Sequence, residues 1–391
     1  MTTLWTYPWS LYAEGVDEAL ADLATRGVDA VAPAAHYHSV ESMQPRTPDR
    51  LFDRRAGGCY FDPDPERFAE TPVDPVPNAV EGVDDPLAGV VDAAADHGLA
   101  VHGWTVLFHN SRLGAANPEY QTRDAFGNAH EHSFCPSHEA VRAYFEAVVG
   151  SLADYGLSEI ELESVGYPSA FHPHDTTFGH HKRQVLTTPT EEWLFSQCFC
   201  EACRSRAAER DVNVDRARSI VRRLLRESFE DPHSDPPALA ALLREYPTLD
   251  DLFDVRAEVV GDLLERLAAA AGDADLDCYL MDGFGVDPGD GWPAGVRLDD
   301  VERHCDRATA LCYVSDPDVA RDRVRTLERS VDVPVDAGVT LDPDVVQREA
   351  EFRALFEAVR AEATGDVNVY HHSLATEAQL DWVARATEAG R

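Results

Sequence analysis

Short apolar runs and amphipathic stretches alternate along the whole chain. Each apolar run has the length of a β-strand, and each following stretch repeats apolar positions every three or four residues, as one face of a helix requires. The eight predicted strands lie within LWTYPW, VDAVAPAAH, LAVHGWTVLFH, SEIELE, DLDCYLMDGFG, ATALCYV, VPVDAGV and DVNVYHHS. The predicted helices cover 16–25, 86–97, 139–155, 298–306, 318–330, 345–363 and 377–388, with a long helical region after the fourth strand.

This order of elements predicts the fold class. Strands that alternate with helices pair in parallel through right-handed crossovers. Eight such units with none left over favour a closed (β/α)8 TIM barrel over an open doubly wound sheet. We expect residues 1–391 to form one barrel domain, with residues 204–270 as a helical insertion in the fourth crossover. Loops 37–83 and 164–190 follow strands, so they would lie at the C-terminal face, where barrel enzymes hold their active sites.

The charge and composition of the chain limit the kinds of molecule that it is expected to bind. The 391 residues include 71 Asp and Glu against 34 Lys and Arg, a net charge of −37. Such a field repels nucleic acid and anionic membranes and is typical of salt-adapted, halophilic proteins. The chain has no 18-residue apolar run, no signal-peptide pattern at its start and no glycine-rich nucleotide loop. We therefore expect a cytoplasmic protein without nucleic-acid or membrane partners, and homo-oligomerisation stays open.

The fourth predicted strand carries a row of acids in GLSEIELESVGYP. Side chains on a strand alternate between faces, so Glu159, Glu161 and Glu163 share one face and Ile160 and Leu162 share the other. In a barrel the face toward the helices is apolar, so the glutamates should point inward. Glu163 would then stand at the C-terminal rim, and Glu161 one layer deeper, protonated or paired with a base. Glu159 is expected to be solvated.

The other predicted strand ends are rich in aromatic and imidazole side chains. Carbohydrate sites use such groups, because aromatic rings stack on sugar C–H faces and polar groups bind hydroxyls. The predicted substrate-binding residues are Tyr7, Trp9, His36, His38, Trp104, His109, Glu161, Tyr370 and His371, with His174, His180 and His181 from the loop FHPHDTTFGHHK. We interpret this histidine-rich loop as a polar lid, and a metal site is the alternative.

Two aspartates are candidate partners for Glu163. Asp282 is placed at the end of the fifth predicted strand and Asp336 at the end of the seventh. Two carboxyl groups that flank a glycosidic bond act as acid plus nucleophile, or as acid plus base. We predict Asp282 as the partner, with Asp336 as the second choice, and a helix-cap or loop role is the alternative for each.

Four cysteines have the pattern of a metal site. Cys198, Cys200 and Cys203 lie in CFCEAC after the fourth predicted strand, and Cys135 lies in FCPS after the third. Adjacent crossovers bring these segments together, and four thiolates close a tetrahedral zinc site. Because such a site leaves no open position, we expect the zinc to be structural. Buried free thiols are the alternative.

At these residues the sequence resembles the zinc-bearing β-galactosidases of glycoside hydrolase family 42. The resemblance covers about residues 100–205 and rests on the strand-end Glu, the C-x-C-x-x-C motif and NPEYQTRDAFGNAHEHSFCPS upstream. It implies a (β/α)8 barrel, Glu163 as acid/base and the four cysteines as structural zinc ligands. The chain differs in carrying Leu162 where that family has Asn, and Asp336 and Asp342 near the seventh strand where it has Glu.

These observations together predict a glycoside hydrolase that acts on a small glycoside or oligosaccharide. Glu163 would protonate the leaving oxygen, while Asp282 or Asp336 acts as nucleophile or base. One alternative is a metal-dependent sugar isomerase or epimerase that uses His36, Glu163, Asp282 and the loop histidines. Another is a barrel that binds carbohydrate without turnover.

Overall fold

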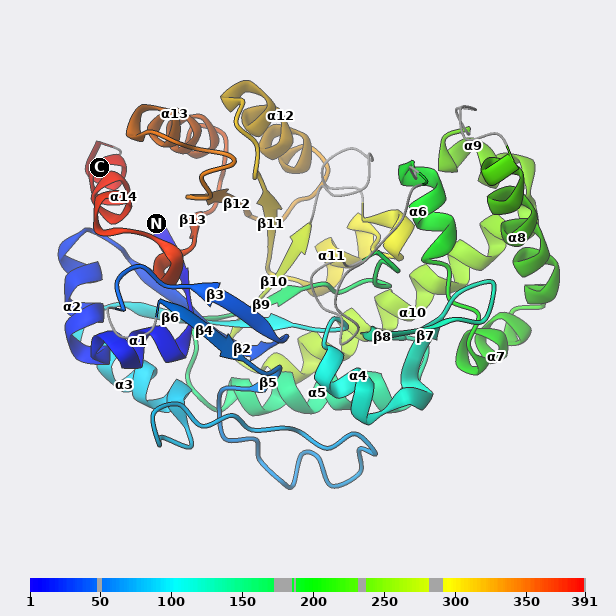
Figure 1. Ribbon diagram of the computed structural model, residues 1–391, viewed down its shortest axis with the longest axis horizontal. Coiled ribbons are helices and arrows are strands. Elements are labelled where there is room, and N and C mark those ends of the chain that lie inside the picture. The colour runs from blue at the N-terminus through cyan, green and yellow to red at the C-terminus, as the bar shows by residue number, and fades with distance from the viewer. Residues whose placement is uncertain (48–50, 172–184, 186–187, 231–236, 281–290, 390–391) are drawn as a thin grey trace.

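Eight parallel strands close into a barrel in the computed structural model, which describes residues 1–47, 51–171, 185, 188–230, 237–280 and 291–389 (Figure 1). The barrel closes because the first strand pairs with both the second and the last. The barrel strands are, in spatial order, β1 (Thr2–Thr6), β2 (Ala30–Tyr37), β6 (Ala100–Val106), β9 (Glu159–Glu163), β10 (Asp275–Leu280), β11 (Arg307–Leu311), β12 (Val335–Thr340) and β13 (Val367–Tyr370). The (β/α)8 TIM barrel predicted from the sequence is confirmed.

A helix follows each barrel strand and packs against the outside of the sheet. These helices are α2 (Val16–Thr25), α3 (Pro86–His97), α5 (Glu139–Ala153), α10 (Pro247–Ala271), α11 (Leu298–His304), α12 (Pro317–Glu328), α13 (Glu349–Arg360) and α14 (Glu377–Ala389). Helix α3 shows why the predicted ends hold: Asp85 accepts a hydrogen bond from the Ala88 amide, Pro86 starts the helix, and Gly98 ends it in the left-handed conformation.

The two faces of each strand have different surroundings. Ile160 and Leu162 of β9 are fully buried in the main apolar core between sheet and helices. Glu161 lies between them on the opposite face, inside the barrel, and is also fully buried. The predicted orientation of β9 is therefore confirmed, but Glu159 is buried rather than solvated, because the barrel interior extends below the start of the strand.

The barrel interior changes character along its axis. Its upper part is a separate cluster of aromatic side chains that includes Trp5, Tyr7, Trp104 and Tyr279. Gly338 makes room for it, because a Cβ there would lie 2.9 Å from the Trp5 ring. The lower part is polar and buried, and its residues include Thr3, His102, Glu159, Glu161, Asp277, Thr309, Asp336 and Asn368.

Several short elements decorate the strand ends. Between β2 and α3 the chain forms the hairpin β3 (Val40–Met43) and β4 (Phe52–Arg55), and then β5 (Gly58–Cys59), which extends the sheet antiparallel to β2. The remaining short elements are α1 (Pro8–Glu14), α4 (Ser111–Ala116), η1 (Pro118–Tyr120), β7 (Gln121–Arg123), β8 (Ala129–Phe134), η2 (Trp292–Ala294) and η3 (His372–Leu374). Most of this material adds to the C-terminal face of the barrel.

The chain between β9 and the second half of α10 forms a helical layer beside the barrel (Figure 1). It consists of α6 (Pro189–Phe195), α7 (Glu201–Glu209), α8 (Val214–Glu230), α9 (Leu239–Glu245) and the start of α10. On α8, buried Val214, Ala217, Val221 and Leu225 recur every three or four residues and belong to a second hydrophobic cluster, which also includes Ala125 from the segment between β7 and β8. The assignment of residues 204–270 as an insertion within one domain stays a prediction.

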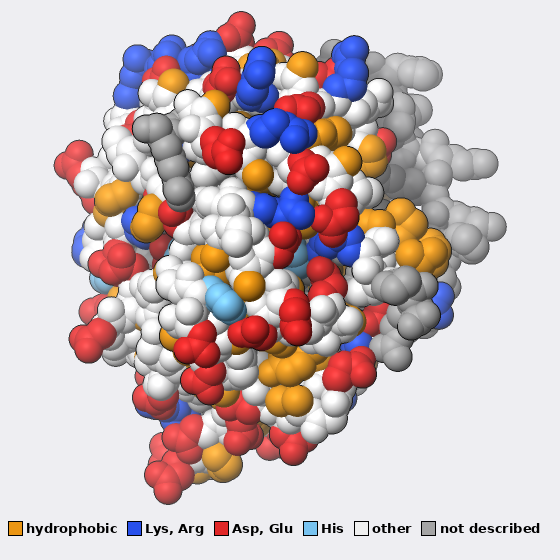
Figure 2. Space-filling model, turned by 90° about the vertical axis from the view of Figure 1, so that its left-hand side faces the viewer, with side chains coloured by type: hydrophobic (Ala, Val, Ile, Leu, Met, Phe, Trp, Pro, Cys, Tyr) orange, Lys and Arg blue, Asp and Glu red, His pale blue; other side chains and the backbone are white. Residues whose placement is uncertain are grey.

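The acidic side chains visible in Figure 2 are dispersed rather than gathered in one patch. On the face drawn in Figure 2, Asp and Glu side chains occur throughout, with arginines between them. Among the described helices, none is long and apolar enough to cross a membrane.

Candidate active site

Glu163 stands where the sequence placed it, at the C-terminal end of β9. Its carboxylate accepts a hydrogen bond of 2.7 Å from Trp104 Nε1 on the neighbouring strand β6. The next residue, Ser164, has a φ of 60°, in the left-handed region that non-glycine residues seldom occupy. Backbone strain of this kind concentrates at functional sites.

The surroundings of Glu163 favour its protonated form. Burial raises the pKa of this carboxyl group, and the nearby Glu161 raises it further. The hydrogen bond from Trp104 and the electrostatic effect of nearby His109 both lower this pKa, but the net shift is still upward. A carboxyl group whose pKa is raised keeps its proton at higher pH, which is what a general acid requires.

Two adjoining cavities meet at Glu163. One has a volume of about 220 Å³ and is lined by His38, His109, His132, Tyr167 and Pro168, among others. The other has a volume of about 200 Å³ and is lined by Trp5, Tyr7, Tyr37, Trp104, Tyr313 and Tyr370, among others. Glu163, His38 and Tyr279 line both cavities. Together they reach the lower part of the range of about 300–1,000 Å³ that is usual for small-molecule sites.

The second cavity has aromatic walls. Tyr7 packs on Trp104 with nearly parallel rings, and Trp104 meets Tyr370 edge to face at 6.1 Å. Burial raises the pKa of the hydroxyl groups of Tyr7, Tyr37 and Tyr370. These phenols therefore keep their protons and can donate hydrogen bonds. The predicted roles of Tyr7, Trp104 and Tyr370 are consistent with their position here.

Three imidazole side chains form part of the wall of the first cavity. His38 stacks on His109 at 4.8 Å, and His109 meets His132 edge to face at 5.9 Å. His38 and His109 were among the predicted binding residues, whereas His132 was not. His132 lies on β8, an element that the strand–helix pattern of the sequence did not reveal.

Glu161 lies directly beneath the cavity floor. Trp5 Nε1 donates to its carboxylate at 2.7 Å, Tyr279 donates through its hydroxyl, and His102 Nδ1 lies 3.0 Å away. The expectation that Glu161 pairs with a base is confirmed, but the side chain is fully buried and lines neither cavity. Tyr279 was missed by the sequence analysis, although the alternation along β10 puts it on the same inward face as Asp277.

The predicted position of His36 at the rim is wrong. His36 is fully buried outside the barrel, with Nδ1 2.7 Å from the Val106 carbonyl and Nε2 3.1 Å from the Tyr144 hydroxyl. Burial lowers the pKa of this imidazole to about 4. The cause is a register shift between Ala34 and His36, which reverses the facing of the strand end.

The predicted position of Asp336 is also wrong. It is the second residue of β12, which runs on to Thr340, so its carboxylate lies in the lower interior of the barrel. Arg307 Nε donates to it at 3.0 Å, and the Asp366 amide donates at 2.6 Å. With 1% of its surface exposed and no contact with the cavities, Asp336 is a structural ion-pair partner.

Two residues that were predicted at the rim pack against Tyr7, on the side away from the cavities. Trp9 is fully buried and stacks on Tyr7 at 4.3 Å, and His371 is buried 4.1 Å from the same ring. Neither lines the two cavities. The predicted residues Asp282, His174, His180 and His181 lie outside the described residues.

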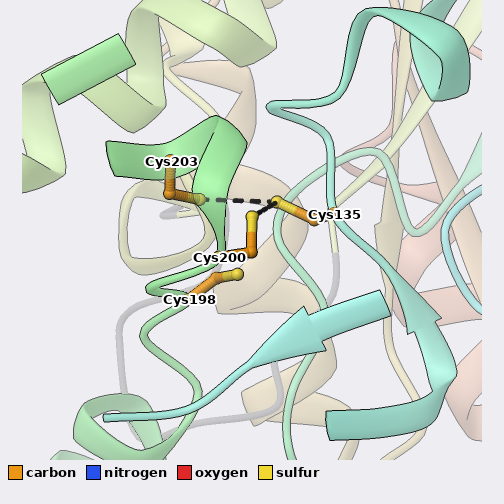
Figure 3. A group of neighbouring side chains, drawn as sticks. All are labelled: Cys135, Cys198, Cys200 and Cys203. Atoms are coloured by element: carbon orange, nitrogen blue, oxygen red, sulfur yellow. Dashed lines mark hydrogen bonds between the residues drawn. The ribbon is translucent and has the colours of Figure 1, made fainter. Parts of the chain in front are cut away.

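The four cysteines of the predicted metal site come together (Figure 3). Cys135 follows β8, whereas Cys198, Cys200 and Cys203 lie at the start of α7, and all four sulfurs lie within 4.8 Å of one another. Cys135 Sγ is 3.4 Å from Cys203 Sγ and 3.6 Å from Cys200 Sγ. Burial raises the pKa of Cys135, whereas hydrogen bonds from the other three sulfurs lower the pKa of Cys200. This buried group of thiols can bind a metal ion.

The fold and the position of the cavities define a (β/α)8 barrel with its candidate site at the C-terminal ends of the strands. Solved structures of glycoside hydrolases share this fold. A β-galactosidase from the psychrophilic Marinomonas ef1 aligns with a TM-score of 0.59 and 10% identity, over 100% of this chain and 59% of its own. Alpha-L-fucosidase isoenzyme 2 from Paenibacillus thiaminolyticus aligns with a TM-score of 0.55 and 11% identity, over 95% of this chain and 46% of its own.

These similarities establish the fold. The chain spans about half the length of these two proteins. No protein-family model matches the chain, and no curated protein matches it in sequence.

Proposed function

We propose that this protein is a glycoside hydrolase that acts on a small glycoside or oligosaccharide, with Glu163 as the general acid. The observation that carries the proposal is the partly buried Glu163 carboxyl group, whose pKa is raised, at the junction of two cavities with aromatic and imidazole side chains in their walls. Glycosidases need one carboxylic acid that is protonated at working pH beside the scissile bond.

In the proposed reaction, Glu163 donates its proton to the glycosidic oxygen as that bond breaks. The Trp104 hydrogen bond orients the carboxyl group and then stabilises the carboxylate that remains. The rings of Trp104 and Tyr370 offer apolar surface to the sugar, and the imidazoles of His38 and His109 offer hydrogen bonds to its hydroxyls.

The second carboxylate is proposed to be Asp282. Glu163 is the only Asp or Glu among the described residues that line the two cavities. Asp282 follows Leu280, the last residue of β10, and β10 is the neighbour of β9 in the barrel. A carboxylate from that position would serve as nucleophile or as base.

The cysteine cluster is proposed to hold a structural zinc ion. Four thiolates are the donor set that zinc prefers in structural sites. The cluster joins the segment after β8 to the start of α7, so a bound ion would fix the helical layer against the barrel. This zinc set is the part of the sequence that resembles family 42 β-galactosidases.

The substitution Glu163→Gln tests the proposal directly. Gln keeps the size of the side chain and its acceptor for Trp104, but has no proton to donate. We expect kcat/KM on an aryl-glycoside panel, measured in molar potassium chloride, to fall by about 10²- to 10⁴-fold, the usual contribution of a general acid.

Glu119→Gln is the matched control, because Glu119 is exposed on η1 and lines neither cavity. It should retain wild-type rates. The role of Glu163 is refuted if both variants turn over an active glycoside at the same rate. Tight binding of a sugar by folded wild-type protein without any turnover would instead favour a carbohydrate-binding barrel.

A metal-dependent isomerase is not favoured by the described residues. The groups that could hold a metal there are the cysteine cluster and two sets of side chains in the lower interior of the barrel, away from the cavities. Hydrolysis that persists in a chelator, with the fold retained, would separate the glycosidase from the isomerase.

A further inference from the structure

Three carboxyl groups converge in the lower interior of the barrel, on the opposite side of the aromatic cluster from Glu163. They belong to Glu159 on β9, Asp277 on β10 and Asp336 on β12, with 4%, 0% and 1% of their surfaces exposed. One oxygen from each lies within 4.8 Å of the other two. Buried carboxylates at this spacing repel one another strongly unless something compensates their charge.

The protein compensates this charge only in part. Arg307 Nε lies 3.3 Å from Glu159 and 3.0 Å from Asp336, and the same guanidinium also reaches Asp366 at 3.3 Å. Arg307 is the only arginine among the described residues that contacts any of the three carboxyl groups, and it contacts two of them. Asp277 receives a single hydrogen bond, from the Thr309 hydroxyl at 2.5 Å. The N-terminal ammonium group pairs with Asp366 at 2.7 Å, and His102 Nδ1 lies 3.9 Å from Glu159. Asp277 has no ion-pair partner among the described residues.

Several buried polar atoms in the barrel interior have no hydrogen-bond partner. They include Oδ1 of Asp277 and Oε1 of Glu159, so two of the three carboxyl groups each hold an uncommitted oxygen. Asn368 on β13 is 1% exposed, and neither polar atom of its side chain has a partner. Asn368 points into the barrel, because Val367 and Val369 beside it pack in the outer core. Buried polar groups that lack partners in the protein indicate a missing ligand.

We propose that the lower interior binds one hard divalent cation of the calcium class, held by Glu159, Asp277 and Asp336. Carboxylate and amide oxygens are the ligands that such cations prefer, whereas zinc favours nitrogen and sulfur. Calcium binds oxygen at about 2.3–2.6 Å, so oxygens on opposite sides of the ion would be separated by roughly the spacing found here. The ion would supply the two positive charges that Arg307 does not.

The site would stabilise the fold rather than take part in turnover. It lies toward the N-terminal ends of the strands, the face of a barrel that serves stability. The ion would connect three strands that are not all neighbours, because β11 lies between β10 and β12. The inference does not depend on the proposed glycosidase activity.

Calcium content and thermal unfolding of the full chain test the inference. Protein stripped with EGTA and passed through a desalting column would be given CaCl2 alone, and bound calcium would be measured by elemental analysis. We expect about one calcium per chain and a rise of several degrees in the unfolding midpoint as calcium increases. Repeating the titration with and without a zinc-selective chelator would separate the effect of calcium on the unfolding midpoint from any effect of metal bound at the cysteine cluster.

Asp277→Asn is the informative variant, and Asp275→Asn, on the same strand but exposed, is its control. The control should respond to calcium as the wild type does, whereas Asp277→Asn should lose most of the calcium-dependent shift. In EGTA, Asp277→Asn should be at least as stable as the wild type, because it removes an uncompensated charge.

The inference is overturned if wild-type protein retains no calcium and its midpoint does not move with added calcium. In that case the carboxyl groups share protons instead. Elemental analysis of the wild type decides the matter even if Asp277→Asn does not fold.

Discussion

At the residue scale, the pKa of Glu163 depends on the hydrogen bond that the Trp104 indole donates to its carboxylate. The Trp104 hydrogen bond stabilises the carboxylate and so lowers the pKa of Glu163, while burial raises this pKa. The balance between these two effects should be visible in the pH dependence of catalysis, because a general acid works only while it holds its proton.

We expect kcat/KM of the wild type to fall as the pH rises through the raised pKa of Glu163. In Trp104→Phe the hydrogen bond that favours the carboxylate is absent, so this pKa should rise further and the fall should move to higher pH. The measurement is the pH profile of kcat/KM for both proteins. A shift to lower pH, or identical profiles, would contradict the assigned contact; a lower overall rate alone would not.

The sequence predicted the position of Glu163 and the pairing of Glu161 because strand alternation is a strong constraint when one face must be apolar. It misplaced His36 and Asp336 for two different reasons. A register shift in β2 breaks the alternation that puts His36 at the rim. For Asp336 the predicted strand end was wrong, because β12 continues for four residues beyond it, to Thr340.

At the element scale, the cysteine cluster joins the segment after β8 to α7. Removing one thiol should abolish binding of the proposed zinc ion and loosen the helical layer, because structural zinc contributes directly to folding. We expect Cys200→Ser to lose bound zinc, measured by elemental analysis, and to unfold at a clearly lower temperature, with a loss of several kcal/mol.

Cys312→Ser is the comparison for that variant, since Cys312 is an equally buried thiol outside the cluster. It should keep the zinc and lose less stability. If the two serine variants hold the same amount of zinc and unfold together, the cluster consists of buried free thiols.

The order of strands and outer helices could be predicted because each element has its own hydrophobic period. The short hairpins could not. Strands such as β3 and β4 are four residues each and largely exposed, so their sequence carries little apolar alternation. His132 contributes to the wall of the candidate site and lies on β8, whose sequence AHEHSF is mostly polar although its second half is buried, so this strand carries little apolar alternation either.

At the scale of the whole molecule, the net charge of −37 acts against compactness. Self-repulsion among exposed carboxylates is screened by salt, and the screening length falls from about 10 Å at 0.1 M to about 3 Å at 1 M. We expect the unfolding midpoint, followed by circular dichroism, to rise between 0.1 and 1 M KCl.

NaCl at equal ionic strength should give the same rise if screening is the cause. A midpoint that falls with added salt would mean that the exposed ion pairs, such as Arg26 with Asp22 and Asp381, outweigh the general repulsion. The fold itself is insensitive to this balance, because strand alternation and helix periodicity, not charge, determine it.

The aromatic cluster inside the barrel has a consequence for how this chain can change. Trp5, Tyr279 and Trp104 form a partition between two acidic compartments, with Glu163 above it and Glu159, Asp277 and Asp336 below. Each compartment contacts its own set of strand ends, so substitutions on one side leave the other's immediate contacts in place. The residues that line the candidate site and those of the lower interior can therefore be substituted independently of each other.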